Sequence, residues 1–326
     1  MKITVLGAGA WGTALARLLA LRNQEVTLWD FFPETVAGIR RTGCNERYLP
    51  GIPLPPGLQV EADAGRAVAG AELVVVASVS KGFRAVTKML AGYDGIVVSV
   101  TKGIEFETGM TMTDILAESA PRACAVAMSG PTFAIEVAKG IPTAIVAASG
   151  DAAAAQTVQA LFHCPAFRVY TSSDVRGVEL GGALKNVIAI GAGVCDGLGF
   201  GDNSKAALVT RAVAEMRRLG VACGAQAETF AGLSGLGDLM VTCFSRLSRN
   251  RGFGERLGRG EQAEAIVASM TAVAEGYPNA RSAHELARKR GVVSPILDEV
   301  HAMLYEGKNV RQAVQDLTAR ESKAED

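Results

Sequence analysis

Three glycines near the beginning of the chain have a spacing that suits the binding of a dinucleotide. Gly7, Gly9 and Gly12 form the pattern G-x-G-x-x-G, directly after an apolar run at residues 3–6 and directly before a segment with helical character. In a strand–turn–helix of this kind, the first glycine allows a tight turn and the second lets a pyrophosphate approach the backbone. The third lets the helix pack close to the strand, and the first N–H groups of that helix face the anion. The alternative is a glycine-rich turn that binds nothing.

An acidic residue follows at the position where the ribose of a dinucleotide is expected. Asp30 directly follows the expected strand 25–29 and lies 18 residues after Gly12. A carboxylate at this position accepts hydrogen bonds from ribose hydroxyls and repels a 2′-phosphate, so the sequence favours NAD(H). Arg40 and Arg41 lie further along the chain and could still accommodate NADP(H).

A lysine lies in the most apolar long segment of the chain. Lys185 belongs to the expected helix 173–195, which is apolar nearly all round and is therefore expected to be buried. A buried lysine must be paired, must reach the surface or must lose its charge, and desolvation lowers the pKa of an ammonium toward the range of a useful base. We interpret Lys185 as functional, because glycines and the polar Asn186 lie beside it in this segment. The alternative is a lysine whose ammonium reaches the surface at a domain junction.

Further candidate site residues follow expected strands or share a helix face. Lys102 follows the strand 96–100 and Gly130 follows the strand 123–128, and ligands of open α/β sheets bind just beyond such ends. Asp238 and Thr242 lie four residues apart, on one face of the expected helix 235–244. The segment 248–251 reads Ser-Arg-Asn-Arg, and a guanidinium suits a phosphate. For Lys102 the alternative is an ordinary loop lysine, and for Gly130 it is an ordinary tight turn. For the segment 248–251 the alternative is a solvated charged face.

These residues require an alternating series of strands and helices to position them. The first half of the chain has short, continuous apolar runs separated by helical segments, which indicates strands covered on both faces in a mainly parallel sheet. We therefore predict an α/β fold, with a Rossmann-like, mainly parallel sheet domain at residues 1–172 and an all-helical domain at residues 173–326. Helices of the second domain are expected at 173–195, 204–223, 225–231, 235–244, 261–269, 277–290, 295–305 and 309–318.

Composition and residue usage exclude several other kinds of function. Lys plus Arg and Asp plus Glu both number 33 in 326 residues, which argues against a role in nucleic-acid or membrane-surface binding based on bulk charge. The six cysteines show no C-x-x-C spacing and the three histidines form no constellation, so we predict no metal site. The first expected strand begins at Lys2, and no apolar segment is long and uninterrupted enough to span a membrane. We therefore expect a cytoplasmic protein with reduced thiols and no integral membrane association.

Taken together and in this order, these segments resemble the NAD(P)-dependent glycerol-3-phosphate dehydrogenases, most closely the bacterial type. The resemblance covers nearly the whole chain, and its most specific part is the lysine–asparagine segment with its glycine-rich continuation. The motifs that carry it are Gly-Ala-Gly-Ala-Trp-Gly at 7–12, Tyr-Leu-Pro-Gly at 48–51, Thr-Lys-Gly-Ile-Glu at 101–105, Gly-Pro-Thr-Phe-Ala at 130–134, Leu-Lys-Asn-Val at 184–187, Cys-Asp-Gly-Leu-Gly-Phe-Gly-Asp-Asn at 195–203, Gly-Leu-Gly-Asp-Leu at 235–239, Thr-Cys at 242–243, Ser-Arg-Asn at 248–250 and Val-Ala-Glu-Gly at 273–276.

The resemblance implies the interconversion of dihydroxyacetone phosphate and sn-glycerol 3-phosphate by hydride transfer with NAD(P)H, in a homodimer that supplies glycerol 3-phosphate for phospholipid synthesis. It implies that Lys185 accepts the proton during alcohol oxidation and donates it in the reverse direction. The implied catalytic residues are Lys185, Lys102, Asp238 and Thr242. The implied substrate-binding residues are Lys102, Gly130, Lys185, Asp238, Ser248, Arg249 and Asn250. The implied cofactor-binding residues are Gly7, Gly9, Ala10, Trp11, Gly12, Asp30, Phe31, Lys102, Thr132, Ala134, Arg249, Val273 and Glu275.

One departure from the family and two other functions remain to be considered. Many bacterial members carry basic residues just after the second strand, whereas this chain reads Trp-Asp-Phe-Phe at 29–32, which favours NAD(H). A β-hydroxyacid or ketopantoate-type dehydrogenase would also pair a nucleotide domain with a lysine-bearing helical domain. A non-catalytic NAD-binding sensor would tolerate the loss of Lys185 or Lys102, yet both are present.

Overall fold

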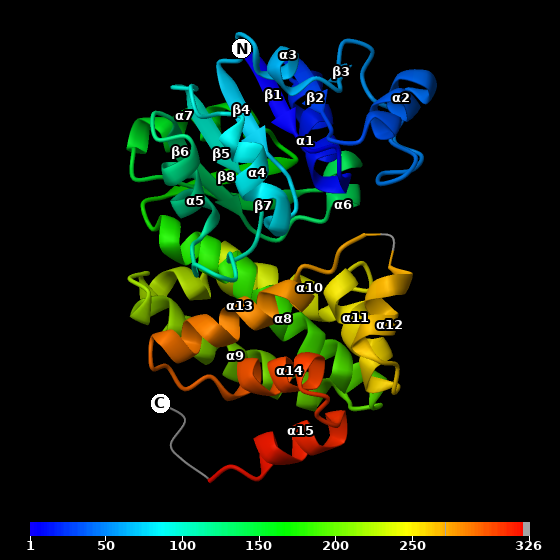
Figure 1. The fold of residues 1–326 in the computed structure, drawn as a ribbon, viewed down its shortest axis with the longest axis vertical. Helices are drawn as coiled ribbons and strands as arrows, with labels where there is room; N and C mark the ends of the chain where they lie inside the picture. Colours follow the sequence, from blue (N-terminus) through cyan, green and yellow to red (C-terminus); the bar gives the residue numbers. More distant parts are fainter. Residues whose placement is uncertain (271, 322–326) are drawn as a thin grey trace. The chain divides into compact units, whose positions relative to one another are not determined.

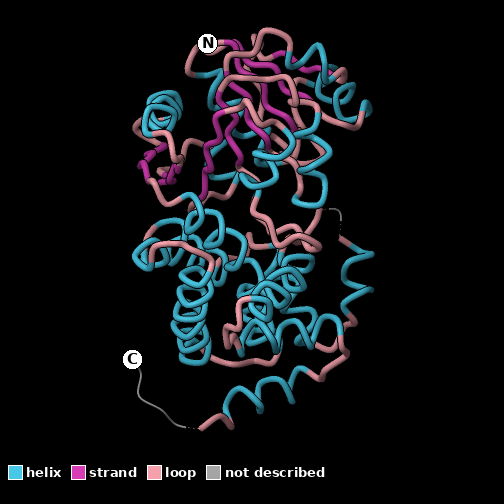
Figure 2. The backbone as a smooth tube through the Cα atoms, turned by 60° about the vertical axis from the view of Figure 1, so that its left-hand side comes forward, coloured by secondary structure: helices cyan, strands magenta, loops and turns pink. Residues whose placement is uncertain are grey.

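The computed structural model describes residues 1–270 and 272–321, which form two compact units (Figure 1). The first unit consists of Met1–Glu105 and Met110–Glu179, and the second consists of Phe106–Gly109 and the chain from Leu180 onward. Figure 2 shows that the strands belong to the first unit, whereas the second is built of helices and loops. The predicted fold class, a Rossmann-like sheet followed by a helical part, is confirmed.

The first unit is built on one eight-stranded sheet with the strand order β3-β2-β1-β4-β5-β6-β7-β8. Neighbouring strands are parallel except for the antiparallel pair β6 and β7, so the mainly parallel sheet is confirmed. The short strand β3 was not expected from the sequence. The strands are β1 (Lys2–Leu6), β2 (Glu25–Trp29), β3 (Gln59–Glu61), β4 (Leu73–Val76), β5 (Ile96–Ser99), β6 (Cys124–Ser129), β7 (Thr143–Ala148) and β8 (Phe167–Ser172).

Helices cover both faces of this sheet, which explains why its strands are apolar throughout. On one face, α1 (Ala10–Leu21) and α7 (Ala152–Phe162) form a core with residues such as Val5 and Val75. On the other face, α3 (Ala64–Val68), α4 (Phe83–Lys88) and α5 (Met112–Ser119) pack on residues such as Val74 and Val76. The remaining elements of this unit are α2 (Pro33–Thr42), the short turn η1 (Ser80–Gly82) and α6 (Ala134–Ala138).

The second unit is helical, and most of its helices begin or end close to the expected residues. Pro295 begins α14, as expected, and the Asn309 side chain caps α15 by accepting hydrogen bonds from the N–H groups of Arg311 and Gln312. The elements are α8 (Val175–Gly197), which begins in the first unit, α9 (Asp202–Ala222), η2 (Ala227–Ala231), η3 (Leu233–Gly237), α10 (Asp238–Phe244), α11 (Arg249–Gly258), α12 (Ala263–Ser269), α13 (Gly276–Lys289), α14 (Pro295–Tyr305) and α15 (Val310–Thr318).

Helix α11 was missing from the expected helices, because its first residues were interpreted as a charged cluster. Its start carries an ordinary signal: the Ser248 side chain accepts a hydrogen bond from the N–H of Arg251 at 3.1 Å. Glycines at 252, 254 and 258 lower its intrinsic helical preference and hid its periodicity.

Glycines let α11 pack directly against the backbone of α8. A Cβ atom on Gly193 would lie 2.0 Å from the carbonyl oxygen of Arg251, and one on Gly254 would lie 1.9 Å from that of Ile190. Side chains are therefore excluded from this contact. Helix α8 is the one helix of the described chain that is long and apolar enough to cross a membrane, but its entire apolar window lies inside the protein, as in a core helix.

Candidate active site

The glycine-rich turn of the first unit has the geometry that a dinucleotide requires. Gly7 has a φ of +115°, and a Cβ atom on it would lie 2.8 Å from the carbonyl oxygen of Ala77. A Cβ on Gly12 would lie 1.9 Å from the carbonyl oxygen of Gly7, so this glycine lets α1 sit close to β1. In contrast, a Cβ on Gly9 would meet no described atom within 4 Å. Gly9 faces open space at the start of α1, where a pyrophosphate fits.

A buried asparagine that sequence reasoning missed ties a distant loop to this turn. The Asn45 Nδ2 donates to the carbonyl oxygen of Ala8 at 2.7 Å and to the Thr13 hydroxyl at 2.8 Å. Asn45 is only 2% exposed. A polar residue in a turn-rich loop gives no pattern that could have identified this contact. The loop of residues 43–48 is thereby fixed beside the cofactor turn.

Asp30 lies at the carboxyl end of β2, as the sequence indicates. Its carboxylate accepts hydrogen bonds from the N–H groups of Ala8 at 2.7 Å and Phe32 at 3.0 Å. Burial raises the pKa of this carboxyl, while the two N–H donors oppose the increase. Each carboxylate oxygen accepts more than one hydrogen bond, so Asp30 retains acceptor capacity for ribose hydroxyls. The neighbouring Phe31 ring is 73% exposed.

The other expected residues of the first unit lie at or near the same carboxyl edge of the sheet. Lys102, just after β5, donates from Nζ to the carbonyl oxygen of Gly130 at 3.0 Å, and Gly130 follows β6. The Thr132 hydroxyl donates to the same oxygen at 3.1 Å. Ala134 begins α6, and Ala10 begins α1. Trp11 is half-buried in α1, and its ring centroid lies 6.5 Å from that of Phe167.

The second unit contains a buried lysine held by a carboxylate and a hydroxyl. The Nζ of Lys185, on α8, lies 2.9 Å from Oδ1 of Asp238 and donates to the Thr242 hydroxyl at 2.7 Å. Lys185 is 7% exposed and Asp238 is 2% exposed. A carboxylate so close to an ammonium in a buried environment favours the charged form of the lysine. The Nζ of Lys185 is thus held in a fixed direction by two buried partners.

The element that presents Asp238 begins irregularly. Residues of η3 form a π-helical turn that runs directly into α10, and Asp238 is the first residue of α10. Such turns are frequent at functional sites. The Thr242 hydroxyl donates to the carbonyl oxygen of Asp238 at 2.6 Å, so the two residues share one helix face, as the sequence indicates.

The basic segment begins α11, with Ser248 as its cap. Surrounding atoms lower the pKa of the Arg249 guanidinium by desolvation, and the charge of Glu275 opposes this shift. The guanidinium remains protonated nonetheless, since arginine does not lose its charge in proteins. Although neighbouring atoms desolvate part of it, the Arg249 side chain reaches the surface and lines a pocket there together with Arg246. Arg256 also lines this pocket, but its guanidinium pairs with Glu261. Val273, also expected at the cofactor, is 48% exposed.

Asn250 has its amide engaged within the protein. Its Nδ2 donates to Oδ1 of Asn186 at 2.8 Å, and its Oδ1 accepts from the N–H of Gly276 at 2.9 Å. This amide bridge connects α8, α11 and the start of α13. Asn250, next to Arg249, therefore fixes the backbone beside Lys185 and beside Glu275 through Asn186 and Gly276. One N–H of its amide is used for Asn186, and the other can donate to a substrate.

The structure thus groups the expected residues into one set on each unit. The first unit carries the glycine-rich turn, Asp30 and Lys102, and the second carries the Lys185 and Arg249 sets. A dinucleotide turn on a parallel sheet, followed by a helical unit with a buried, paired lysine, defines a nicotinamide-dependent dehydrogenase.

Comparison with known proteins identifies the particular family. Residues 2–155 match the model for the N-terminus of NAD-dependent glycerol-3-phosphate dehydrogenase, and residues 174–315 match the model for its C-terminus. The chain belongs to the NAD-dependent glycerol-3-phosphate dehydrogenase family. The resemblance inferred from the motifs is therefore confirmed, as is the assignment to an NAD(P)-dependent oxidoreductase.

Relatives match over the full length of the chain. Glycerol-3-phosphate dehydrogenase [NAD(P)+] of Trichlorobacter lovleyi is 52% identical, covering 100% of this chain and 99% of its own. The protein of the same name from Geobacter sulfurreducens is 50% identical, covering 99% and 98%. Among solved structures, glycerol-3-phosphate dehydrogenase from Coxiella burnetii is 36% identical, covers 98% of this chain and 99% of its own, and has a TM-score of 0.95.

Proposed function

We propose that this protein interconverts dihydroxyacetone phosphate and sn-glycerol 3-phosphate with NAD(P)(H). The observation that carries the proposal is the buried Lys185 ammonium, held by Asp238 and Thr242 in the same helical unit as Arg249. A proton donor and a phosphate-binding guanidinium are the two groups that reduction of a phosphorylated ketone requires of the protein.

Lys185 has the role of acid and base in this proposal. As the ketone carbon receives hydride, negative charge develops on its oxygen, and an oriented ammonium stabilises that charge and delivers the proton. In the reverse direction the neutral amine takes the proton from the alcohol. Asp238 and Thr242 fix the direction of the ammonium, and the nicotinamide supplies or accepts the hydride when bound.

Arg249 and its neighbours provide binding energy away from the reacting carbon. The guanidinium would hold the phosphate, with Ser248 and Asn250 completing the substrate contacts of this unit. Lys102 and Gly130 are also among the proposed substrate-binding residues. The expected cofactor-binding residues comprise Gly7, Gly9, Ala10, Trp11, Gly12, Asp30, Phe31, Lys102, Thr132, Ala134, Arg249, Val273 and Glu275. We assign dinucleotide binding to residues 1–172 and substrate binding and dimerisation to residues 173–326.

The setting of the reaction is also part of the proposal. We infer a cytoplasmic homodimer that supplies glycerol 3-phosphate for phospholipid synthesis. Measurement of the protein's size in solution tests whether it is a dimer. To test the supply of glycerol 3-phosphate, the protein is depleted in its host and phospholipid synthesis is measured with and without added glycerol 3-phosphate.

One assay separates this function from its alternatives. Oxidation of NADH and NADPH is followed with dihydroxyacetone phosphate, with unphosphorylated dihydroxyacetone and with ketopantoate. Rapid turnover of only the phosphorylated ketone supports the proposal. Preference for ketopantoate would instead indicate the β-hydroxyacid or ketopantoate type, and dinucleotide binding without turnover of any ketone would indicate a sensor.

A further inference from the structure

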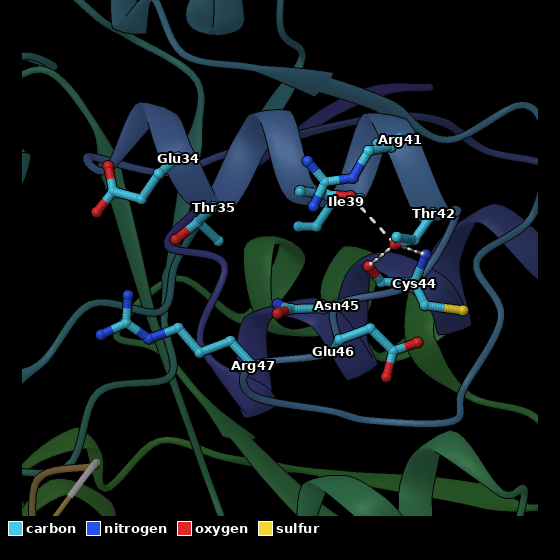
Figure 3. A pocket seen from close by; sticks show the side chains of 10 residues that line it. Glu34, Thr35, Ile39, Arg41, Thr42, Cys44, Asn45, Glu46 and Arg47 are labelled. Atoms are coloured by element: carbon cyan, nitrogen blue, oxygen red, sulfur yellow. Dashed lines mark hydrogen bonds between the residues drawn. The ribbon is translucent and has the colours of Figure 1, made fainter.

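A small pocket of the first unit lies beside the expected ribose position and has no role in the proposed reaction. It has a volume of about 190 Å³ and lies between α2 and the loop of residues 43–48 (Figure 3). Asn45 anchors this loop on the cofactor turn through Ala8 and Thr13. The loop that forms one side of the pocket is therefore held in place by its hydrogen bonds to the cofactor turn.

The pocket contains a polar atom that lacks a partner. Thr35 is 6% exposed, and its hydroxyl makes no hydrogen bond within the part of the chain that the structure describes. Figure 3 shows this hydroxyl on the side of α2 that faces the loop. A buried hydroxyl without a partner loses free energy, and a ligand that accepts its proton would restore it.

Two arginines, Arg41 and Arg47, line the pocket, whereas Arg40 of the same helix end does not. Arg40 donates from both Nε and Nη2 to the carbonyl oxygen of Val60, so its guanidinium is held on β3. Arg41 lines the pocket near Thr42, at the end of α2. Arg47 is exposed, and Figure 3 shows its side chain running beneath α2 toward the first turn, where Thr35 lies.

The charges of two residues that line the pocket act on the Asp30 carboxyl, the group expected at the ribose. Burial is the main cause that raises the pKa of this carboxyl; the charge of Glu34 raises it further and the charge of Arg47 lowers it. The carboxyl group expected at the ribose hydroxyls is therefore within electrostatic reach of one cation and one further anion.

We propose that Arg47 and Thr35 receive the 2′-phosphate of NADP(H) in this pocket, an inference that rests on the proposed function. Arg47 supplies the positive charge and the Thr35 hydroxyl donates a hydrogen bond. The carboxylates of Asp30 and Glu34 repel the same phosphate and thereby limit the affinity for NADP(H). Since Asp30 can still accept hydrogen bonds from ribose hydroxyls, the pocket admits NADP(H) without excluding NAD(H). Arg40, which the sequence offered for this role, is held elsewhere.

Binding measurements on the full-length protein test the assignment. The dissociation constants of NADPH, NADH and 2′,5′-ADP are measured by calorimetry for the wild type, Arg47→Ala and Thr35→Val. We expect Arg47→Ala to weaken NADPH and 2′,5′-ADP by about tenfold, the loss of one charge-assisted hydrogen bond, and to leave NADH unchanged. Thr35→Val, which keeps the shape of the side chain, should weaken the same two ligands by a smaller factor.

Arg66→Ala is the matched control, because Arg66 is an exposed arginine of the same unit that pairs with Glu61 outside the pocket. It should leave all three constants unchanged. Equal weakening of NADPH and NADH by Arg47→Ala, an unchanged NADPH constant, or a wild type that binds NADH but neither phosphorylated ligand would each overturn the assignment. A wild type that binds no dinucleotide at all would overturn both the assignment and the proposed function, whereas failure to reduce dihydroxyacetone phosphate would count against the function alone.

Discussion

A buried ammonium can transfer a proton productively only if its direction is fixed. Lys185 meets this requirement through residues that are distant in sequence, since Thr242 lies 57 residues further along the chain. The apolar helix around Lys185 predicts burial and the need for a partner, but no sequence pattern assigns that partner. Asp238 and Thr242 were correctly expected to share a helix face, and the family resemblance grouped them with Lys185. The contact of this face with Lys185 itself comes from the fold.

Replacing Lys185 should stop catalysis and leave cofactor binding intact. We expect Lys185→Ala to lower kcat by roughly 10²–10⁴-fold, the usual contribution of a positioned acid or base. The NADH dissociation constant should not change. Lys205→Met is a suitable control, because Lys205 is an equally buried lysine that pairs with Asp196 instead. A Lys185→Ala variant with most of its kcat would contradict the assigned role.

Replacing Arg249 should mainly affect the phosphorylated substrate. A charge-assisted hydrogen bond to a phosphate contributes roughly 1.5–3 kcal/mol, so Arg249→Ala should lower kcat/KM for dihydroxyacetone phosphate by about tenfold or more. The same ratio for unphosphorylated dihydroxyacetone should change much less. Equal losses on both substrates would show that Arg249 does not bind the phosphate.

Asp30 should make the wild-type enzyme prefer NADH to NADPH. Its carboxylate accepts hydrogen bonds from ribose hydroxyls and repels a 2′-phosphate. Asp30→Ala should therefore relax the preference, and the double variant Asp30→Ala, Phe31→Arg should gain on NADPH and lose on NADH. The measurement is kcat/KM for both cofactors. A wild type that prefers NADPH several-fold would mean that Asp30 does not meet the ribose.

At the scale of elements, the contact between α8 and α11 leaves no space for a side chain. We expect Gly193→Ala to destabilise the protein by at least about 1–3 kcal/mol, because its Cβ would lie 2.0 Å from the carbonyl oxygen of Arg251. Gly252→Ala on α11, the other helix of the pair, is the control, since its Cβ would meet no described atom within 4 Å. It should raise stability by up to about 1 kcal/mol. Urea unfolding of both variants measures the difference, and equal effects would refute the packing argument.

The junction of α9 and α14 should make stability depend on pH. The Glu215 carboxylate accepts hydrogen bonds from the N–H groups of Ile296 and Leu297, and burial raises its pKa to about 7. The charges of Arg218 and Asp298 shift the same pKa down and up, respectively. Because the folded pKa is above the unfolded one, the stabilisation is complete below about pH 4.5 and is lost as the pH rises through about 7.

Removing this titration should flatten the pH profile. Between about pH 5 and pH 8, we expect the free energy of unfolding of the wild type to fall by up to about 3 kcal/mol. The free energy of unfolding of Glu215→Gln should not show this decrease. Glu228→Gln, at an exposed carboxyl of the same unit, should keep the wild-type profile. Parallel profiles for the wild type and Glu215→Gln would disprove the role of Glu215.

Over the whole molecule, the sequence predicted best where burial on both sides produces a continuous apolar pattern. The long strands and α8 are of this kind. Element β3 has only three residues and half-exposed positions, and α11 is rich in glycine, so neither produced a signal. Contacts such as that of Asn45 with the cofactor turn depend on tertiary structure alone, and the pocket beside it was equally hidden from the sequence.

The glycine contacts between α8 and α11 also have a consequence for the substrates that the proposed site would accept. Since backbone meets backbone at Gly193 and Gly254, we expect the two helices to resist sliding past one another and to limit changes in the separation of Lys185 and Arg249. If Lys185 and Arg249 act as proposed, we predict that the second unit selects ketones by the length of carbon chain between carbonyl and phosphate. With the phosphate held at Arg249, one added methylene would displace the carbonyl by more than 1 Å and cost about a hundredfold in rate. Under this proposal, discrimination against longer sugar phosphates would come from the rigidity of the helix pair.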